Sequence, residues 1–258
     1  MTSLYTQSMR IVSWNCNGAL RKKTDAIDSL SADMLIIQEC EDPERSLKAY
    51  QQWAGCYIWK GSSKNKGIGV FARNGTEIKS LSWYREFRIP GMPVTSASAT
   101  WKTDELREFV PFRVNNTFNT VAIWTKQSTG GTFGYAGQLW KYLQSHRRDL
   151  AEDECLLIGD LNSNVQWDRP DRWWNHTDNV LILKEIGLHS LYHEFNGIEQ
   201  GNEPDPTLYH RRKLETPYHI DYAFASKRLR TGAKIEVLQP EEWLAFSDHM
   251  PLLVELTL

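Results

Sequence analysis

The chain has 258 residues, of which 41% are hydrophobic and 24% are charged, values that are ordinary for a globular protein with a hydrophobic core. Its 30 basic and 32 acidic side chains give a net charge of −2, so a polyanion would have to be bound by local basic clusters. The longest aliphatic runs have about four residues, which predicts neither a secretory signal nor a transmembrane helix. We therefore expect a cytoplasmic protein without a membrane partner.

Apolar runs typical of strands alternate with segments of helical periodicity. In chain order, the sequence predicts strands at 10–14, 33–38, 67–73, 94–101, 109–114, 119–125, 154–159, 220–226, 234–238 and 250–257. It predicts helices at about 22–31, 43–54, 135–150 and 178–190. Asn115 and Asn116 indicate a hairpin between two of the strands. His146 shares the apolar face of the third helix, so we expect it to be a packed structural residue.

No composition break, long linker or repeat divides the chain. We expect residues 9–258 to form a single domain, preceded by a polar extension over residues 1–8. Many strands with interspersed helices and hairpin signals favour mixed sheets covered by helices over a purely parallel sheet. The cysteines at 16, 40, 56 and 155 have neither CxxC nor CxxH spacing, and we interpret them as small buried hydrophobic residues rather than a disulfide framework.

The most informative segment is IGDLNSNV, residues 158–165. Asp160 and Asn162 stand where a short apolar strand ends, and positions two apart in a strand share a face. Asp160 is therefore our best candidate for a general base, and Asn162 for a donor to water or phosphate. A lone GDxN motif is a weak signal, because Gly-Asp also opens many turns.

Four other polar clusters adjoin apolar runs: WNCNG at 14–18, QE at 38–39, HIDY at 219–222 and SDH at 247–249. Glu39 suits a Mg²⁺ ligand, and it is equally well interpreted as the first acidic residue of a loop. Asn15 and Asn17 could orient a phosphate or a metal-bound water, although Asn-x-Asn-Gly is also an ordinary turn sequence.

Asp221 lies inside an otherwise apolar strand, where an unpaired carboxylate would be costly to bury. A hydrogen bond from His249 would satisfy it and would fix the tautomer of the imidazole. The alternative is a structural buried pair without a catalytic part. We favour catalysis, because several clusters agree.

These five clusters, in this order, resemble the endonuclease/exonuclease/phosphatase superfamily, and the resemblance spans residues 10 to about 256. It implies a four-layer α/β/β/α sandwich with two mixed β-sheets flanked by helices and a site at one edge. It also implies a phosphoester hydrolase that uses Mg²⁺, with Mn²⁺ as a substitute. The roles carried over are metal binding by Glu39 with Asn15 and Asp248 close by, activation of water by Asp160, positioning of water by Asn162, and contact with the scissile phosphate by His249 paired with Asp221.

The sequence departs from this pattern at three places. Many relatives carry histidine or tyrosine where Trp124, Thr125 and Lys126 stand here, and Lys126 is either a phosphate donor or a surface lysine. His219 replaces an arginine that often precedes the IDY element. The Cys-Asp-Arg signature of inositol phosphatases is absent, which disfavours that activity.

Nucleic acid, and DNA first, is the substrate that the sequence favours. The basic clusters 21–23 and 211–213, the latter including Arg211, each adjoin a motif, and Trp173 and Trp174 could stack on a base. Asn17 is a further binding candidate. Two alternatives remain open: a phosphodiesterase or phosphatase for small molecules or lipid headgroups, and an inactive scaffold that binds nucleic acid or protein. We expect no obligate protein partner.

Overall fold

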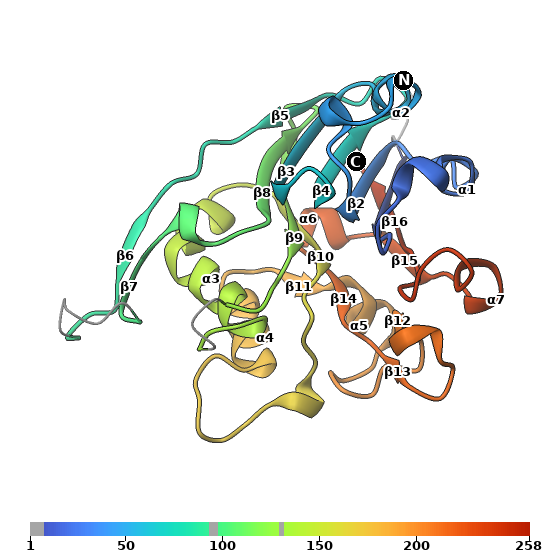
Figure 1. Cartoon of the computed structure of the whole chain (residues 1–258). Coiled ribbons are helices and arrows are strands. Elements are labelled where there is room, and N and C mark those ends of the chain that lie inside the picture. Colours follow the sequence, from blue (N-terminus) through green and yellow to red (C-terminus); the bar gives the residue numbers. More distant parts are fainter. Residues whose placement is uncertain (1–7, 93–97, 129–131) are drawn as a thin grey trace, which may run out of the picture.

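The computed structural model describes residues 8–92, 98–128 and 132–258, and two six-stranded sheets face each other at its centre (Figure 1). The first sheet has the order β15 (Lys234–Val237), β16 (Leu252–Thr257), β1 (Ser8–Asn15), β2 (Met34–Cys40), β4 (Lys66–Ala72) and β3 (Tyr57–Ser63). The second has the order β11 (His189–Ser190), β14 (Asp221–Ala225), β10 (Cys155–Asp160), β9 (Phe118–Trp124), β8 (Phe109–Val114) and β5 (Ile78–Ser80). Both sheets are mixed, because β1 and β2 are parallel, as are β9 and β10, whereas the neighbours of these pairs are antiparallel.

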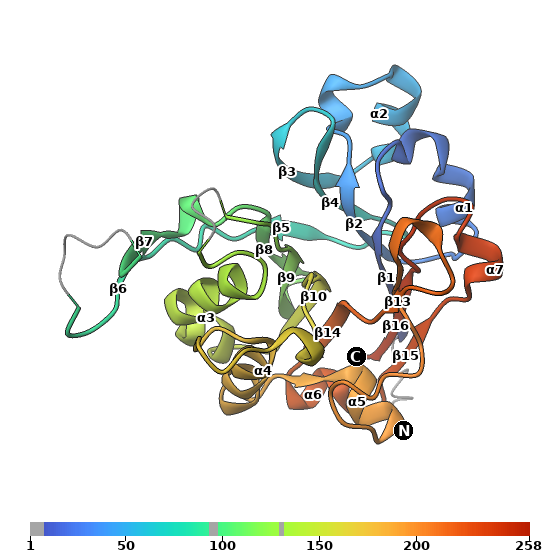
Figure 2. The ribbon, with the colours of Figure 1, turned by 60° about the horizontal axis from the view of Figure 1, so that its bottom comes forward.

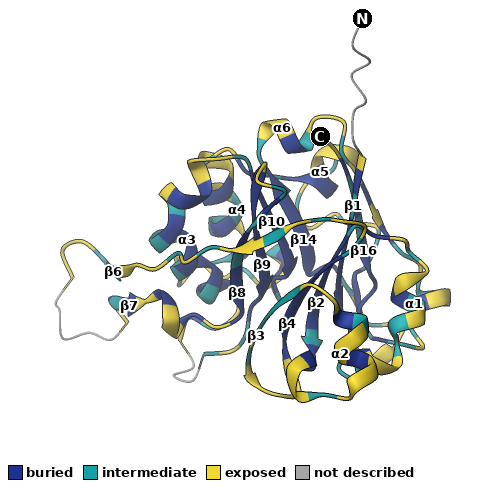
Figure 3. Ribbon diagram, turned by 90° about the horizontal axis from the view of Figure 1, so that it is seen from above, coloured by how far each residue is buried: buried dark blue, intermediate teal, exposed yellow. Residues whose placement is uncertain are grey.

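Helices cover the outer faces of the two sheets, which gives the four layers expected from the sequence (Figure 3). The helices are α1 (Thr24–Asp28), α2 (Lys48–Ala54), α3 (Ala136–Ala151), α4 (His176–Glu185), α5 (Leu191–Asn196), α6 (Lys227–Arg230) and α7 (Pro240–Trp243). Short 3₁₀ helices are η1 (Leu20–Lys22), η2 (Pro43–Arg45), η3 (Thr103–Glu105), η4 (Val165–Trp167) and η5 (His210–Arg212). Within the described residues, no helix is both long and apolar enough to span a membrane.

Two hydrophobic cores hold the layers together. Leu156 and Ile158 of β10 face the core between the sheets, and Cys155 and Leu157 face the core under α3 and α4. Successive strand residues point to opposite faces, so a strand that is buried on both sides reads as a continuous apolar run. This is why the residues before Gly159 are uniformly apolar, and it places the polar residues of the GDLN segment at the end of a fixed strand.

Two small antiparallel ribbons complete the structure. β6 (Glu86–Arg88) pairs with β7 (Thr100–Lys102), and together they form an arm that projects away from the sheets (Figure 2). β12 (Leu208–Tyr209) pairs with β13 (Pro217–Tyr218). Most of the strand predicted at 94–101 is not seen: residues 93–97 lie outside the described part, and only the end of the predicted range belongs to β7.

Several predicted boundaries were wrong. The helix predicted at 178–190 ends at Glu185, because Gly187 with φ 83° ends the helical path and residues 189–190 pair in β11. The helices predicted at 22–31 and 43–54 are each divided into a 3₁₀ turn and a short α-helix. β3, β5 and β6 were not predicted. β1 begins at Ser8, which pairs with Thr257, so Ser8 belongs to the sheet, and the rest of the polar extension predicted over 1–8 lies outside the described residues.

Other predictions are confirmed. Asn115 and Asn116 both have positive φ in the β8–β9 connection, a conformation that Asn adopts more readily than most residues. His146 is fully buried. All four cysteines are free, and three are buried as expected, whereas Cys56 is exposed.

Candidate active site at one edge of the sandwich

The polar residues singled out in the sequence lie where strands of both sheets end or begin. Asn15 is the last residue of β1 and Glu39 the penultimate residue of β2, in the first sheet. Asp160 is the last residue of β10 and Asp221 the first of β14, in the second sheet. β1 lies against β10 across the central core, so these four side chains project toward one edge of the sandwich.

Asn15 joins the two sheets at this edge. Its Nδ2 donates to Asp160 Oδ2 at 2.9 Å and approaches Glu39 Oε1 at 3.4 Å. Its backbone oxygen accepts from Ser247 Oγ at 2.7 Å, and its Oδ1 accepts from the backbone N–H of Asn17 at 3.1 Å. Every polar end of Asn15 is therefore fixed, and a single neutral amide brings two carboxylates from opposite sheets together.

Glu39 has an unusual backbone, with φ 61° at an irregularity in the pairing of β2 with β4. Such a bulge redirects a side chain at the end of a strand. The Glu39 carboxylate forms an ion pair with Lys66 on the neighbouring strand β4. No sequence signal predicted this partner, because Lys66 follows a polar hairpin and adjoins no motif.

Asp160 and Asp221 face each other directly across β10 and β14, an arrangement in which two negative charges repel. His249 separates them: its Nδ1 lies 2.9 Å from Asp221 Oδ2 and its Nε2 lies 4.0 Å from Asp160 Oδ2. All three side chains are buried. Their ligand-type atoms lie within 4.8 Å of one another.

Two hydrogen bonds of its backbone hold His249 in place. Its backbone N–H donates to Ser247 Oγ at 3.0 Å, and its carbonyl accepts from Trp14 Nε1 at 2.9 Å. Thr207 Oγ1 accepts from the backbone N–H of Asp221 at 3.0 Å. Thr207 was missed in the sequence, since nothing near it indicates that the residue before β12 contacts the start of β14. Ser247 was seen as part of the SDH cluster, but its bond to Asn15 was not.

The charges of this cluster depend on one another. Burial raises the pKa of Asp160 and the Asp221 carboxylate raises it further, while His249 lowers it, so that the pKa stands at about 7. Burial lowers the pKa of His249, but the Asp221 and Asp160 carboxylates outweigh burial and raise it to about 10. At neutral pH, His249 is therefore an imidazolium whose Nδ1–H is held by Asp221, and Asp160 titrates in the range that suits a general base.

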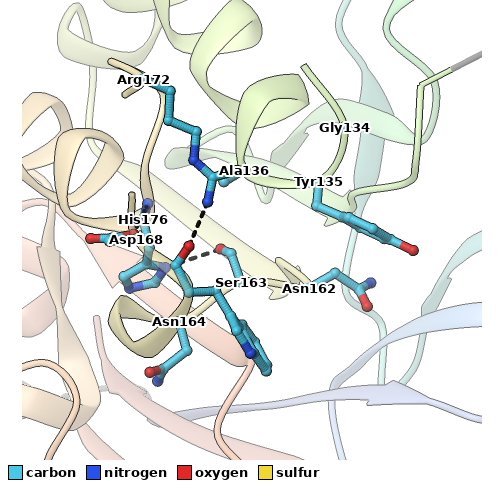
Figure 4. A pocket seen from close by; sticks show the side chains of 10 residues that line it. Gly134, Tyr135, Ala136, Asn162, Ser163, Asn164, Asp168, Arg172 and His176 are labelled. Carbon is cyan, nitrogen blue, oxygen red and sulfur yellow. Dashed lines mark hydrogen bonds between the residues drawn. The ribbon is translucent and has the colours of Figure 1, made fainter. Parts of the chain in front are cut away.

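Asn162 adopts φ 45°, and its backbone N–H donates to Asp160 Oδ1 at 2.9 Å. Its Nδ2 donates to the backbone oxygen of Thr125 at 3.2 Å, and Asn162 is one of the residues that line a cavity next to the GDLN segment (Figure 4). At the rim, Asn17 Nδ2 donates to Asp248 Oδ1 at 3.0 Å. The metal role predicted for Asp248 stays a prediction.

The remaining predicted binding residues have other contacts. Lys126 forms an ion pair with Glu108 at 3.0 Å and lies over the Trp124 ring. Trp174 packs against Phe133, with ring centroids 4.3 Å apart. Trp173 is 55% exposed and meets Trp174 edge to face, and Arg211 is exposed with φ 56°. Their roles in binding stay predictions.

The donor set fits a hard divalent cation. Glu39 and Asp160 offer carboxylate oxygens within reach of the same amide, that of Asn15. Asp221 Oδ1 is buried and has no hydrogen-bond partner among the described residues. Oxygen donors without a thiolate are typical of Mg²⁺ or Mn²⁺ sites.

Comparison with known proteins agrees with this geometry. The model of the Endonuclease/Exonuclease/phosphatase family matches residues 12–249. The chain belongs to this family. It is thus a member of a group of hydrolases that act on phosphoester bonds. No curated protein sequence matches it.

Solved structures share the fold at low sequence identity. An AP endonuclease from Archaeoglobus fulgidus is 17% identical with a TM-score of 0.66, and the match covers 95% of this chain and 98% of that one. A 3′ phosphatase from Neisseria, bound to a product DNA hairpin, is 17% identical with a TM-score of 0.64 and coverages of 97% and 100%. The APE2 catalytic domain from Xenopus laevis is 15% identical with a TM-score of 0.65 and coverages of 96% and 92%.

Proposed function

We propose that this protein is a Mg²⁺-dependent nuclease that hydrolyses phosphodiester bonds in nucleic acid, with DNA as the favoured substrate. The observation that carries the proposal is the buried carboxylate of Asp160 lying 4.0 Å from the Nε2 of His249, whose Nδ1 lies 2.9 Å from Asp221 Oδ2, at the edge of the two sheets. That arrangement places a proton acceptor and a cationic donor at a spacing that a phosphate oxygen or a water can bridge.

In the proposed reaction, Asp160 accepts a proton from the attacking water, which Asn162 orients. His249 Nε2–H donates to a non-bridging oxygen of the scissile phosphate, and Asp221 keeps the imidazole oriented and charged. Glu39, with Asn15 and Asp160 nearby, would hold the Mg²⁺ ion. When bound, this ion supplies a Lewis acid that neutralises charge on the phosphate.

Two basic clusters beside the site support nucleic acid as the substrate. Lys23 Nζ donates to the backbone oxygens of Cys16 and Gly18, which places the 21–23 cluster beside the Asn15 loop. Arg212 donates to the backbone oxygens of Ala245 and Phe246, which places the 211–213 cluster beside the His249 loop. Exposed cations near the scissile bond contribute to phosphate binding without reading sequence. A cytoplasmic location stays part of the proposal.

The test is a turnover assay over a panel of labelled oligonucleotides (single-stranded, duplex, abasic and RNA) and small phosphoesters, with Mg²⁺, with Mn²⁺ or with chelator. We expect metal-dependent cleavage of oligonucleotides, and Asp160→Asn should lower it by a factor on the order of 10² to 10⁴. Asp153→Asn is the matched control, because Asp153 forms an ion pair with Arg113 and is no part of the site.

Three outcomes separate the candidates. Cleavage of oligonucleotides that Asp160→Asn abolishes supports the proposal. Hydrolysis of small or lipid-headgroup phosphoesters alone identifies the enzyme as a phosphodiesterase or phosphatase of the same fold. Binding of nucleic acid without turnover of any substrate in the panel identifies a scaffold, and either of the last two results overturns the proposal.

A further inference from the structure

A cavity of about 330 Å³ lies next to the GDLN segment, and apart from Asn162 its lining residues have no assigned role (Figure 4). It lies between the start of α3 and the segment that follows the GDLN motif, and Asn162 forms part of its wall. The backbone N–H of Asn162 donates to Asp160 Oδ1 at 2.9 Å, so the cavity wall includes a direct neighbour of the candidate base. A volume at the low end of the range for small-molecule sites suits a single ring system rather than a base pair.

Two aromatic residues lining the cavity are unusually exposed. Tyr135 is 43% exposed and Trp167 is 41% exposed. The backbone oxygen of Trp167 accepts a hydrogen bond from Arg172, and its ring lies 5.1 Å from that of Tyr218. Trp167 is therefore held rigidly although it is open to solvent, and it can provide stacking surface at a low cost in side-chain entropy.

Tyr135 has a strained backbone, with φ 48° and ψ −107°, a conformation that non-glycine residues rarely adopt. Its N–H donates to Lys126 O at 2.8 Å, and its carbonyl accepts from Gln138 N at 2.9 Å. These bonds maintain the conformation. Strained backbone conformations are common at ligand-binding positions. Here the strained conformation places Tyr135 at the cavity rather than in a hydrophobic core.

The polar groups of the lining already have protein partners. Ser163 Oγ lies 3.0 Å from His176 Nδ1, and His176 Nε2 lies 3.1 Å from Gln200 Oε1. Asn164 Nδ2 donates to Tyr222 Oη at 3.1 Å. The cavity therefore offers aromatic and apolar surface, with few free groups that could distinguish one base from another.

We propose that this cavity receives the unpaired base of the nucleotide next to the scissile phosphate, stacked by Trp167 and Tyr135. The proposal rests on the proposed nuclease function and narrows it: the substrate presents an unpaired nucleotide at the site, as in single-stranded, frayed or flipped nucleic acid. Base identity matters little there, because stacking on an aromatic ring is tolerant of sequence.

The test is binding of short oligonucleotides that carry a single fluorescent 2-aminopurine, measured with the uncleaving Asp160→Asn protein in Mg²⁺. The base analogue is placed in turn at each nucleotide along single-stranded DNA and in a fully paired duplex. We expect quenching at one position in the single strand and none in the duplex. Adding Trp167→Ala or Tyr135→Ala should weaken single-strand binding about fivefold to a hundredfold, and Trp167→Phe should restore most of it.

Tyr84→Ala is the matched control, since Tyr84 is a comparably exposed aromatic whose hydroxyl bonds Glu86 on the arm. Equal binding by the Trp167→Ala and Tyr84→Ala proteins, with the thermal melting temperature unchanged, overturns the cavity proposal and leaves the nuclease function standing. Loss of quenching in Trp173→Ala instead overturns it in favour of the stacking site predicted from the sequence. If the wild-type protein cleaves small phosphoesters and no oligonucleotide, the nuclease function itself fails.

Discussion

The described residues contain two buried His–Asp pairs with nearly the same local geometry and different surroundings. His146 Nδ1 lies 2.8 Å from Asp149 Oδ2 within α3, and His249 Nδ1 lies 2.9 Å from Asp221 Oδ2 at the sheet edge. The second nitrogen of His146 is closed by Thr103 Oγ1 at 2.9 Å. The second nitrogen of His249 lies 4.0 Å from a carboxylate, Asp160.

This difference decides the charge of each ring. Burial lowers the pKa of His146, although Asp149 partly offsets the effect and is itself paired with Arg85 at 2.7 Å. The pKa of His249 is raised because two carboxylates face it. A His–Asp pair thus becomes chemically useful when its second nitrogen is left open beside a second negative group, and it is structural when protein atoms satisfy both nitrogens.

The largest effect is expected from metal removal, which should abolish hydrolysis at the His249–Asp221 pair and leave the fold around the His146–Asp149 pair unchanged. The carboxylate oxygens of Glu39 are the proposed ligands of the ion, so we expect phosphoester hydrolysis to fall to background in chelator and to return with Mg²⁺ or Mn²⁺. Circular dichroism should show the fold unchanged. Full turnover by metal-free protein would contradict the assignment of these oxygens.

Removing each imidazole in turn should show which of the two His–Asp pairs takes part in catalysis. His249→Ala should lower kcat by a factor on the order of 10² to 10⁴, because the cationic donor is lost. His146→Ala should leave kcat unchanged, since His146 bonds Thr103 and Asp149 only. The measurement is steady-state turnover of both variants on the same phosphoester, and similar losses in both would remove the distinction.

The pH dependence of kcat/KM should follow the protonation states of Asp160 and His249. Activity should rise with pH as Asp160 loses its proton near its pKa of about 7, and it should fall as His249 loses its proton near its pKa of about 10. The base must be deprotonated and the donor protonated, so the profile is bell-shaped. A profile that is flat between pH 6 and pH 8 would speak against Asp160 as the base.

The smallest effect is expected on stability. Asp149→Asn removes the charge that Arg85 and His146 share, and we expect it to lower the free energy of unfolding by about 1–3 kcal/mol, with kcat unchanged. Urea denaturation of the variant beside wild type measures the loss. An Asp149→Asn protein with wild-type stability would mean that the His146–Asp149 pair does not contribute to the free energy of unfolding.

The central strands and their polar ends could be predicted from the sequence, because β1, β2 and β10 are buried on both faces and read as apolar runs that end abruptly. Asn15, Glu39 and Asp160 were found by this signal. Their meeting across two sheets rested on the resemblance to a family, because no local pattern specifies which strand ends become neighbours.

Long-range register explains what could not be predicted. Lys66 reaches Glu39 only because β4 is adjacent to β2, and Thr207 reaches Asp221 only because β12 pairs with β13, which directly precedes β14. The sequence pointed to Trp173 and Trp174 as stacking residues, a role that stays a prediction, and it assigned no role to Trp167, which lines the cavity beside Asn162. Which tryptophan lines that cavity depends on the path of the segment after the strand, and composition does not encode that path.

The most direct test of the contrast between the His249–Asp221 and His146–Asp149 pairs is the protonation of both imidazole rings at pH 8, measured by ¹⁵N NMR of their nitrogens. The account predicts that His249 carries protons on Nδ1 and Nε2, because its pKa is raised to about 10, and that His146 is neutral, because burial lowers its pKa. A neutral His249 at pH 8, titrating near the ordinary value of about 6.5, would contradict it.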